Sequence, residues 1–312
     1  MFMRLQALLV KAEVTYGTDP VPTGAANAIL AQNVKISPMK GSDVKRDYDR
    51  PYFSAAPTIP VGLHMSISFE IELKGNGAAG TALAFGPLLR ACKWAQVLVA
   101  STSVTYTPHS GTQESCTIYW YLDGQLYKLV GVRGTFTYKL NALGIPVLAF
   151  EMTGLWAAPS TVAIPTVTLG TQLSQIPQVA SSANTPTFTY GGTALILRSF
   201  EFNAGAEVKP RFLVGKEEII ITNAEESIKF TIETPPLATF NPIAVAAAAS
   251  TAAMVLVHGT GAGKICTLNM PAVQIARPEG FDDQDGIVEM ALTGMPLPVA
   301  AAGNDQASLV FT

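Results

Sequence analysis

The chain has 312 residues, enough for one large domain or two ordinary ones, each with its own core. Hydrophobic residues make up 48% of the sequence and charged residues only 14%, well below the quarter that is usual in a soluble domain. The net charge of -3 argues against a general nucleic-acid binder, which needs a basic surface to displace counterions from phosphates. A chain so poor in charge favours a protein that buries much of its surface in an assembly.

Strand-like segments dominate the sequence. The clearest is SISFEIEL (66–73), where apolar and polar side chains alternate as they do in a half-buried strand. The Asp-Gly pair of LDGQ (122–125) predicts a hairpin turn. In chain order, we expect strands at 28–36, 66–73, 103–107, 115–122, 125–130, 132–140, 146–153, 194–202, 227–234, 253–257, 265–269, 271–276 and 286–293.

Each half of the chain has one predicted helix. The helices are expected at 86–97 and 242–252, because Pro87 and Pro242 stand near a first helical turn, where the missing N–H costs nothing.

The two halves resemble each other segment by segment. SISFEIEL (66–73) aligns with SIKFTIET (227–234), and AFGPLLRA (84–91) aligns with TFNPIAVA (239–246). The offset between partners decreases steadily along the chain, which indicates a duplication with longer loops in the first copy. Three further pairs keep the same order: 28–36 with 194–202, 115–119 with 265–269, and 147–155 with 287–295.

We therefore expect a mainly β protein of two tandem β-sandwich or open-barrel domains, each with one short flanking helix. The domains are predicted at 1–157 and 191–312, joined by a Ser-, Thr- and Pro-rich linker at 158–190. Free sheet edges invite pairing with neighbouring chains, and a head-to-tail contact repeated around a closed ring would satisfy every edge. The contact between the two domains would then resemble the contact between chains.

No segment predicts a catalytic, cofactor or metal site. HGTGAGKI (258–265) lacks residues of the phosphate-binding loop and is interpreted as a Gly-rich hairpin loop. FDDQDG (281–286) does not complete a calcium-binding loop and is interpreted as a solvated hairpin tip. The histidines have no metal-binding spacing, and Cys92, Cys116 and Cys266 are expected to be reduced, structural thiols. We expect no enzymatic activity.

A long segment of mixed charge at 39–60 has a shorter counterpart at 205–216. Aromatic side chains among paired charges suit contact with another subunit, while a mobile surface excursion is the alternative interpretation. The candidate contact residues are Lys40, Asp43, Lys45, Arg46, Asp47, Tyr48, Asp49, Arg50, Tyr52 and Phe53.

Three segments in order resemble the tail tube (major tail) proteins of long-tailed bacteriophages: LLVKAEVTYGTDPVPTGAANAI (8–29), IPVG (59–62) before SISFEIEL, and FGPLLRAC (85–92). The resemblance runs through most of the first half and reaches the second half through the repeat. It implies a structural virion protein, in which three two-domain chains form a pseudo-hexameric ring and the rings stack around a DNA-conducting channel. It also implies that residues 39–60 and the N-terminal arm 1–27 contact the adjacent ring.

The same resemblance implies the protein's location and partners. The chain would be assembled in the bacterial host cytoplasm and reside in the virion tail, beside the tape measure, tail terminator and distal tail proteins. DNA would pass without specific binding, and no membrane span is expected. A channel for sliding DNA should lack a basic stripe. The candidate lumen-lining residues are Ser66, Ser68, Glu70, Glu72, Lys229, Thr231 and Glu233, of which Lys229 departs from that demand.

The alternative function is a tandem β-sandwich binding module, carbohydrate-binding or adhesin-like. Such a module predicts a soluble monomer with a cluster of exposed aromatic side chains. Trp94, Trp120 and Trp156 do not fall on one strand face, which argues against it. An enzyme of unrecognised type is the third possibility.

Overall fold

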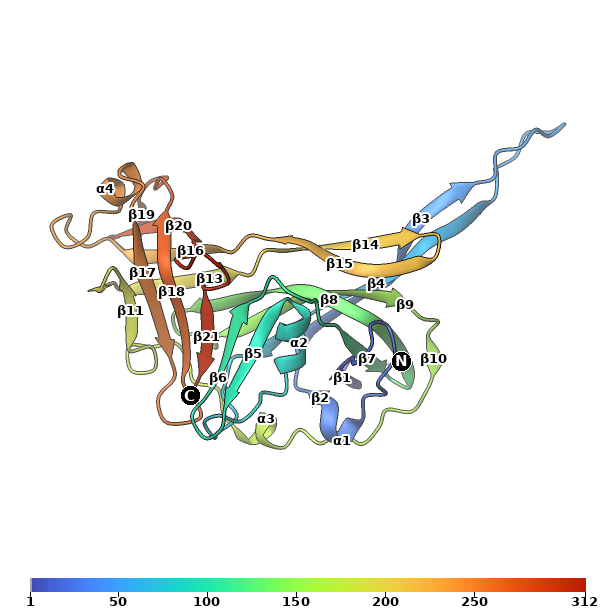
Figure 1. Ribbon diagram of the computed structural model, residues 1–312, viewed down its shortest axis with the longest axis horizontal. Coiled ribbons are helices and arrows are strands. Elements are labelled where there is room, and N and C mark those ends of the chain that lie inside the picture. The colour runs from blue at the N-terminus through green and yellow to red at the C-terminus, as the bar shows by residue number, and fades with distance from the viewer. Residues whose placement is uncertain (1) are drawn as a thin grey trace.

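The computed structural model describes residues 2–312, and this part of the chain is mainly β, with four short helices (Figure 1). The expected fold class is confirmed. Strands from the two halves lie side by side in antiparallel pairs, so the halves are joined by more than the linker.

One continuous antiparallel sheet, here called the long sheet, runs through both halves. Its strands pair in the order β3–β4–β9–β8–β13–β16–β20–β19. The first half contributes β3 (Gln32–Lys45), β4 (Thr58–Glu72), β8 (Gln125–Asn141) and β9 (Val147–Trp156). The second half contributes β13 (Leu197–Asn203), β16 (Ser227–Glu233), β19 (Asp282–Gln284) and β20 (Ile287–Pro296).

The remaining strands form the opposing layer. In the first half this layer holds β1 (Gln6–Ala12), β2 (Ala28–Ile29), β7 (Cys116–Leu122) and β10 (Ser160–Thr161), all connected through the start of β8. A second group contains β5 (Trp94–Val99), β6 (Ser103–Pro108), β11 (Thr187–Tyr190), β12 (Thr193–Ala194), β17 (Thr251–His258), β18 (Cys266–Ile275) and β21 (Ser308–Phe311). Strand β21 lies between β6 and β18 and so joins the halves a second time.

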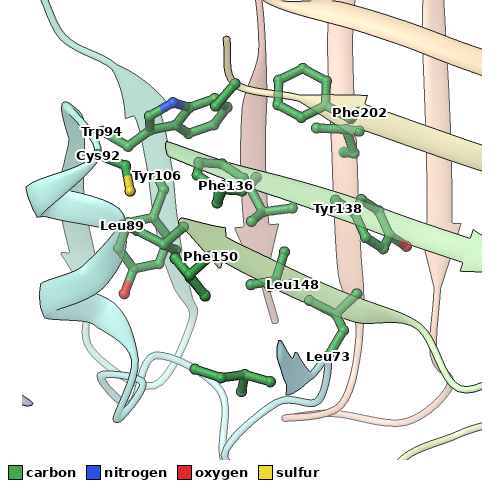
Figure 2. Close-up of a cluster of buried hydrophobic side chains, with 14 of the residues drawn as sticks. Leu73, Leu89, Cys92, Trp94, Tyr106, Phe136, Tyr138, Leu148, Phe150 and Phe202 are labelled. Atoms are coloured by element: carbon green, nitrogen blue, oxygen red, sulfur yellow. The ribbon is translucent and has the colours of Figure 1, made fainter. Parts of the chain in front are cut away.

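A single hydrophobic core lies between the layers and crosses the boundary between the halves. Trp94 packs edge-on against Phe136 of β8 and Phe202 of β13, with ring centroids 5.1 and 5.7 Å apart. Figure 2 shows these rings with Tyr138 and Phe150 in one cluster. Burying each aromatic ring contributes about 1.5–3 kcal/mol, so the junction of the halves is stabilised by packing as well as by strand pairing.

The two expected helices are shorter than the sequence pattern predicts. Helix α2 (Gly86–Ala91) ends because Lys93 adopts a left-handed conformation, with φ of 68°, and β5 begins at the next residue. Helix α4 (Pro242–Ala247) ends before Ala249, which has φ of 48°. The predicted starts at 86 and 242 are confirmed, whereas 94–97 and 251–252 belong to strands.

Residues 158–190 carry little regular structure; their first part follows the first half, and β11 at their end pairs with β17 of the second half. Short helices α1 (Gly24–Asn27) and α3 (Thr171–Ser174) lie near each other there, and Gln172 bonds the backbone of residues 28 and 30. Ile164 and Leu169 pack on a small apolar cluster, and Ala180 is buried in the main core. The three cysteines are free and buried, as expected.

Candidate functional site

The candidate lumen residues lie on one face of the long sheet, here called the polar face. On β4, Ile67, Phe69 and Ile71 are buried in the core, while the intervening Ser66, Ser68, Glu70 and Glu72 point to the other side. On β16, Ile228, Phe230 and Ile232 are buried, and Lys229, Thr231 and Glu233 alternate with them. The alternation predicted from the sequence is therefore confirmed for both strands.

Strand register shows that the two candidate groups share a single surface. Residues directly opposite each other in an antiparallel pair point to the same side of the sheet. One row of such partners crosses six strands, from the first half to the second: Glu72, Val147, Lys139, Glu201, Lys229 and Thr293.

Charges on this row alternate in sign. Glu201 of β13 lies between Lys139 of β8 and Lys229 of β16, so an acidic neighbour offsets the lysine that seemed out of place. The acidic residues of β4 are also partnered. Glu70 accepts a hydrogen bond from Asn33 Nδ2 at 2.6 Å, and Glu72 accepts one from Lys74 Nζ at 2.8 Å.

Two open hollows lie on the polar face. The larger, about 770 Å³, is lined by Lys139, Lys229 and Glu201 together with the segment 277–282. The smaller, about 410 Å³, is lined by Ser66, Ser68, Thr153 and others on the first half. Both signs of charge line the larger hollow, so it offers no site selective for phosphate.

The segment expected as a long loop at 39–60 is a protruding hairpin, here called the arm. Strand β3 continues to Lys45 and β4 begins at Thr58, well beyond the expected ends at 36 and 66. The arm extends away from the rest of the molecule (Figure 1). Polar and apolar residues do not alternate there, because both faces of the arm are exposed. Pro38 and Pro60 also argue against a strand in the sequence.

The tip of the arm exposes aromatic rings among charges. The Tyr48 ring lies beneath the guanidinium groups of Arg50 and Arg46, 4.6 and 5.6 Å from its centroid. Lys45 and Asp47 form an exposed ion pair at 3.3 Å. Phe53 is fully exposed, at 109% of the reference area. The remaining candidates (Lys40, Asp43, Asp49 and Tyr52) lie along the same hairpin and are largely exposed.

A second hairpin, β14 (Ala206–Leu213) and β15 (Lys216–Ala224), has the equivalent position in the other half, between β13 and β16. It lies along the first half near β8 instead of protruding (Figure 1). Phe212 at its end packs against Gly62 and lies 6.1 Å from the His64 ring. Through this contact the hairpin of the second half packs against the first half.

Arg133 anchors this second hairpin. Its guanidinium donates hydrogen bonds to the carbonyls of Ile219 (2.6 Å), Gln113 (3.0 Å) and Glu114 (3.2 Å) and lies 4.6 Å from the Tyr16 ring centroid. No local sequence pattern indicates this role, because Arg133 stands alone in a strand and its partners are backbone atoms distant in sequence.

The segment after β1 is held against the first half. The Glu13 carboxylate accepts hydrogen bonds from Ser115, Thr117 and the backbone N–H groups of Gly17 and Gly131. Asp19 accepts hydrogen bonds from Lys128 and Tyr119. Burial acts to raise the pKa of Asp19, but these two hydrogen bonds, a third from the Val21 N–H and the charge of Lys128 together outweigh it and lower that pKa.

Residues 2–312 contain no cluster of three or more potential metal ligands. None of the helices described is long and apolar enough to cross a membrane. No curated protein matches the sequence. A family model described as phage tail tube protein matches residues 3–308, nearly the whole chain.

Proposed function

The chain belongs to the phage tail tube protein family, a structural component of the virion tail, and we propose that three copies form a ring around a DNA channel. Rings then stack into the tube. The observation that carries this proposal is the polar face, which continues without interruption from one half of the chain to the other. In a ring, repeated long sheets form an inner barrel whose polar face lines the lumen.

The charge pattern of the polar face suits DNA that must slide. A protein that neutralises phosphates releases counterions and binds DNA, so a conducting surface should carry no uninterrupted basic stripe. Lys139 and Lys229 are separated by Glu201, and Ser66, Ser68, Glu70 and Glu72 add hydroxyl and carboxylate groups. The positive charges of this row are therefore interrupted by a carboxylate, as a conducting surface requires.

The arm supports a role in stacking. It carries several apolar side chains that are exposed and so do not stabilise an isolated chain by burial. Exposed apolar patches mark interaction sites. We propose that the arm contacts the adjacent ring, as expected for residues 39–60. The exposed apolar residues on it are Met39, Val44, Tyr48, Tyr52, Phe53 and Ile59.

The other proposed partners follow from a tail tube. We propose the tape measure, tail terminator and distal tail proteins as further partners. The alternative function as a carbohydrate-binding or adhesin-like module needs exposed aromatic side chains. Trp94 and Trp120 are only 2% and 3% exposed and so cannot serve in such a site, while Tyr48, Tyr52 and Phe53 are exposed on the arm.

Negative-stain microscopy of the purified chain tests the assembly, with hollow tubes or annuli expected and isolated particles contradicting it. The lumen is tested by changing Glu70 and Glu72 together to Lys. Tubes should form as in the parent, because both side chains point away from the core, but DNA ejection should slow. A matched double change on the arm, Asp43→Lys with Asp49→Lys, should leave DNA passage unaffected once tubes form. Normal infectivity of the Glu70→Lys, Glu72→Lys variant would contradict the lumen assignment.

A further inference from the structure

The long sheet ends in two unpaired strand edges. Within residues 2–312, β3 has only β4 as a neighbour at one end, and β19 has only β20 at the other. Open edges expose backbone N–H and C=O groups that pair readily with another strand. β19 is also part of an exposed acidic turn, with Asp282, Asp283 and Asp285.

The chain contains its own example of how such edges join. Between the halves, β13 pairs with β8, with Asn203 opposite Thr137, Phe202 opposite Tyr138 and Glu201 opposite Lys139. β13 lies beside β16 as β3 lies beside β4, in the same antiparallel sense. The junction is therefore a template for a contact between two copies.

β19 occupies the position in the second half that β8 has in the first. Lys139 of β8 lies opposite Val147, the first residue of β9. Gln284 of β19 lies opposite Ile287, the first residue of β20. Val147 and Ile287 are partners in the sequence repeat, so Gln284 corresponds to Lys139 and Asp282 to Thr137. On β3, Lys35 and Ser37 lie opposite Ser68 and Ser66, as Glu201 and Asn203 lie opposite Lys229 and Ser227 on β13 and β16. Because 66–73 aligns with 227–234, Lys35 corresponds to Glu201 and Ser37 to Asn203.

We propose that β3 of one copy pairs antiparallel with β19 of the next, with Lys35 opposite Gln284 and Ser37 opposite Asp282. This pairing rests on the proposed ring and specifies its contact. The occupant of each free edge is a second copy of this chain. The reason is that β3 corresponds to β13 and β19 corresponds to β8, and β13 and β8 pair with each other in the internal junction.

Charge supports the same partner. Lys35 on β3 would face the acidic turn of β19, and within the described chain this lysine forms no ion pair. In the internal junction the signs are reversed, since β8 supplies Lys139 and β13 supplies Glu201. An acidic β19 is thus repelled by a β13-type edge and attracted to β3, which selects the correct partner.

Disulfide trapping tests the register. The native cysteines are buried, so Ser37→Cys with Asp282→Cys adds the only accessible thiols among the described residues. Opposed residues in an antiparallel pair lie within disulfide range, whereas a shift of two residues puts Cα atoms at roughly 7–8 Å. Oxidation should therefore produce covalent dimers and trimers, and no larger species, on a non-reducing gel.

Two controls define the result. Ser37→Cys with Gln284→Cys keeps the strands and the face but shifts the register, and it should cross-link at least tenfold less. Thr137→Cys with Asn203→Cys places the pair in the internal junction and should close within one chain, without change in mass. If the double variant assembles poorly, mixing the two single variants should still give a covalent dimer.

Rings seen by microscopy without cross-linked trimers, or equal cross-linking of the shifted pair, would overturn the pairing and leave the tube function standing. A parent chain that forms neither rings nor tubes would overturn both.

Discussion

Phe53 at the tip of the arm allows the stacking role to be separated from folding. Its side chain is fully exposed, so replacing it with Ser removes no contact from the isolated chain. The melting temperature and the urea midpoint should therefore equal those of the parent. If the Phe53 side chain is buried against the adjacent ring of subunits, removing it costs about 1.5–3 kcal/mol per arm.

That cost translates into a measurable change in tube growth. Each 1.4 kcal/mol is tenfold in an equilibrium constant, so each arm contact should weaken by about 10- to 100-fold. The concentration at which tubes appear, followed by light scattering and sedimentation, should rise accordingly. Phe53→Leu is the matched control, because it retains an apolar side chain and should remain close to the parent.

Two results would refute this reasoning. Tubes of Phe53→Ser that appear at the parent's concentration would show that the tip is not buried on assembly. A fall in the melting temperature of the unassembled variant would show that Phe53 already has a structural role within one chain.

The remaining predictions concern one anchor, one titrating group and one charge pair. Arg133→Met should lower the free energy of unfolding by about 2–4 kcal/mol, because three carbonyls lose a charged donor. Amide exchange in β15 should speed up, because the Ile219 carbonyl is one of the three; unchanged exchange would contradict the anchor role. Burial lowers the pKa of His258. The unfolded chain therefore takes up its proton first as pH falls below about 6.5, and stability should fall there. His258→Gln should flatten this decline in urea titrations at several pH values, and an unaltered slope would exclude His258. Lys35→Glu should impair ring formation by repulsion from the acidic turn, and adding Gln284→Lys should restore it, as measured by analytical ultracentrifugation; no rescue would count against that contact.

Local patterns predicted the strands that are buried on one side. SISFEIEL and SIKFTIET follow strict alternation, and the structure places both in the long sheet with the expected faces. The turn at LDGQ forms with Asp123 and Gly124 at positive φ, which is the backbone conformation that this residue pair favours. Such features are determined by residues close together in the sequence, so local patterns can predict them.

Other elements depend on contacts distant in sequence and gave weaker signals. The helix predicted over 86–97 extends into residues that form the start of β5, because nothing in WAQVLV signals that β6 pairs with it. The sequence predicts no strands at β14, β15 and β21. Strand β21 is a short segment that pairs across the halves. The division into domains at 157 and 191 stays a prediction.

The polar face could be outlined from the sequence only in two separate strands. The alignment of Glu72 with Lys229 along one row requires β8 to pair with β13, and register between distant strands is not encoded locally. For the same reason Glu201 was not recognised as the neighbour that offsets Lys229.

The junction between β8 and β13 has a kinetic consequence for the proposed tube. Every binary encounter between free molecules forfeits translational and rotational freedom, at about 4–15 kcal/mol. Because β8 and β13 belong to one chain, every second contact between neighbouring domains of the ring forms within a chain during folding, at a high effective concentration. Annulus formation should then scale with the third power of monomer concentration instead of the sixth, so nucleation remains feasible when the subunit is scarce.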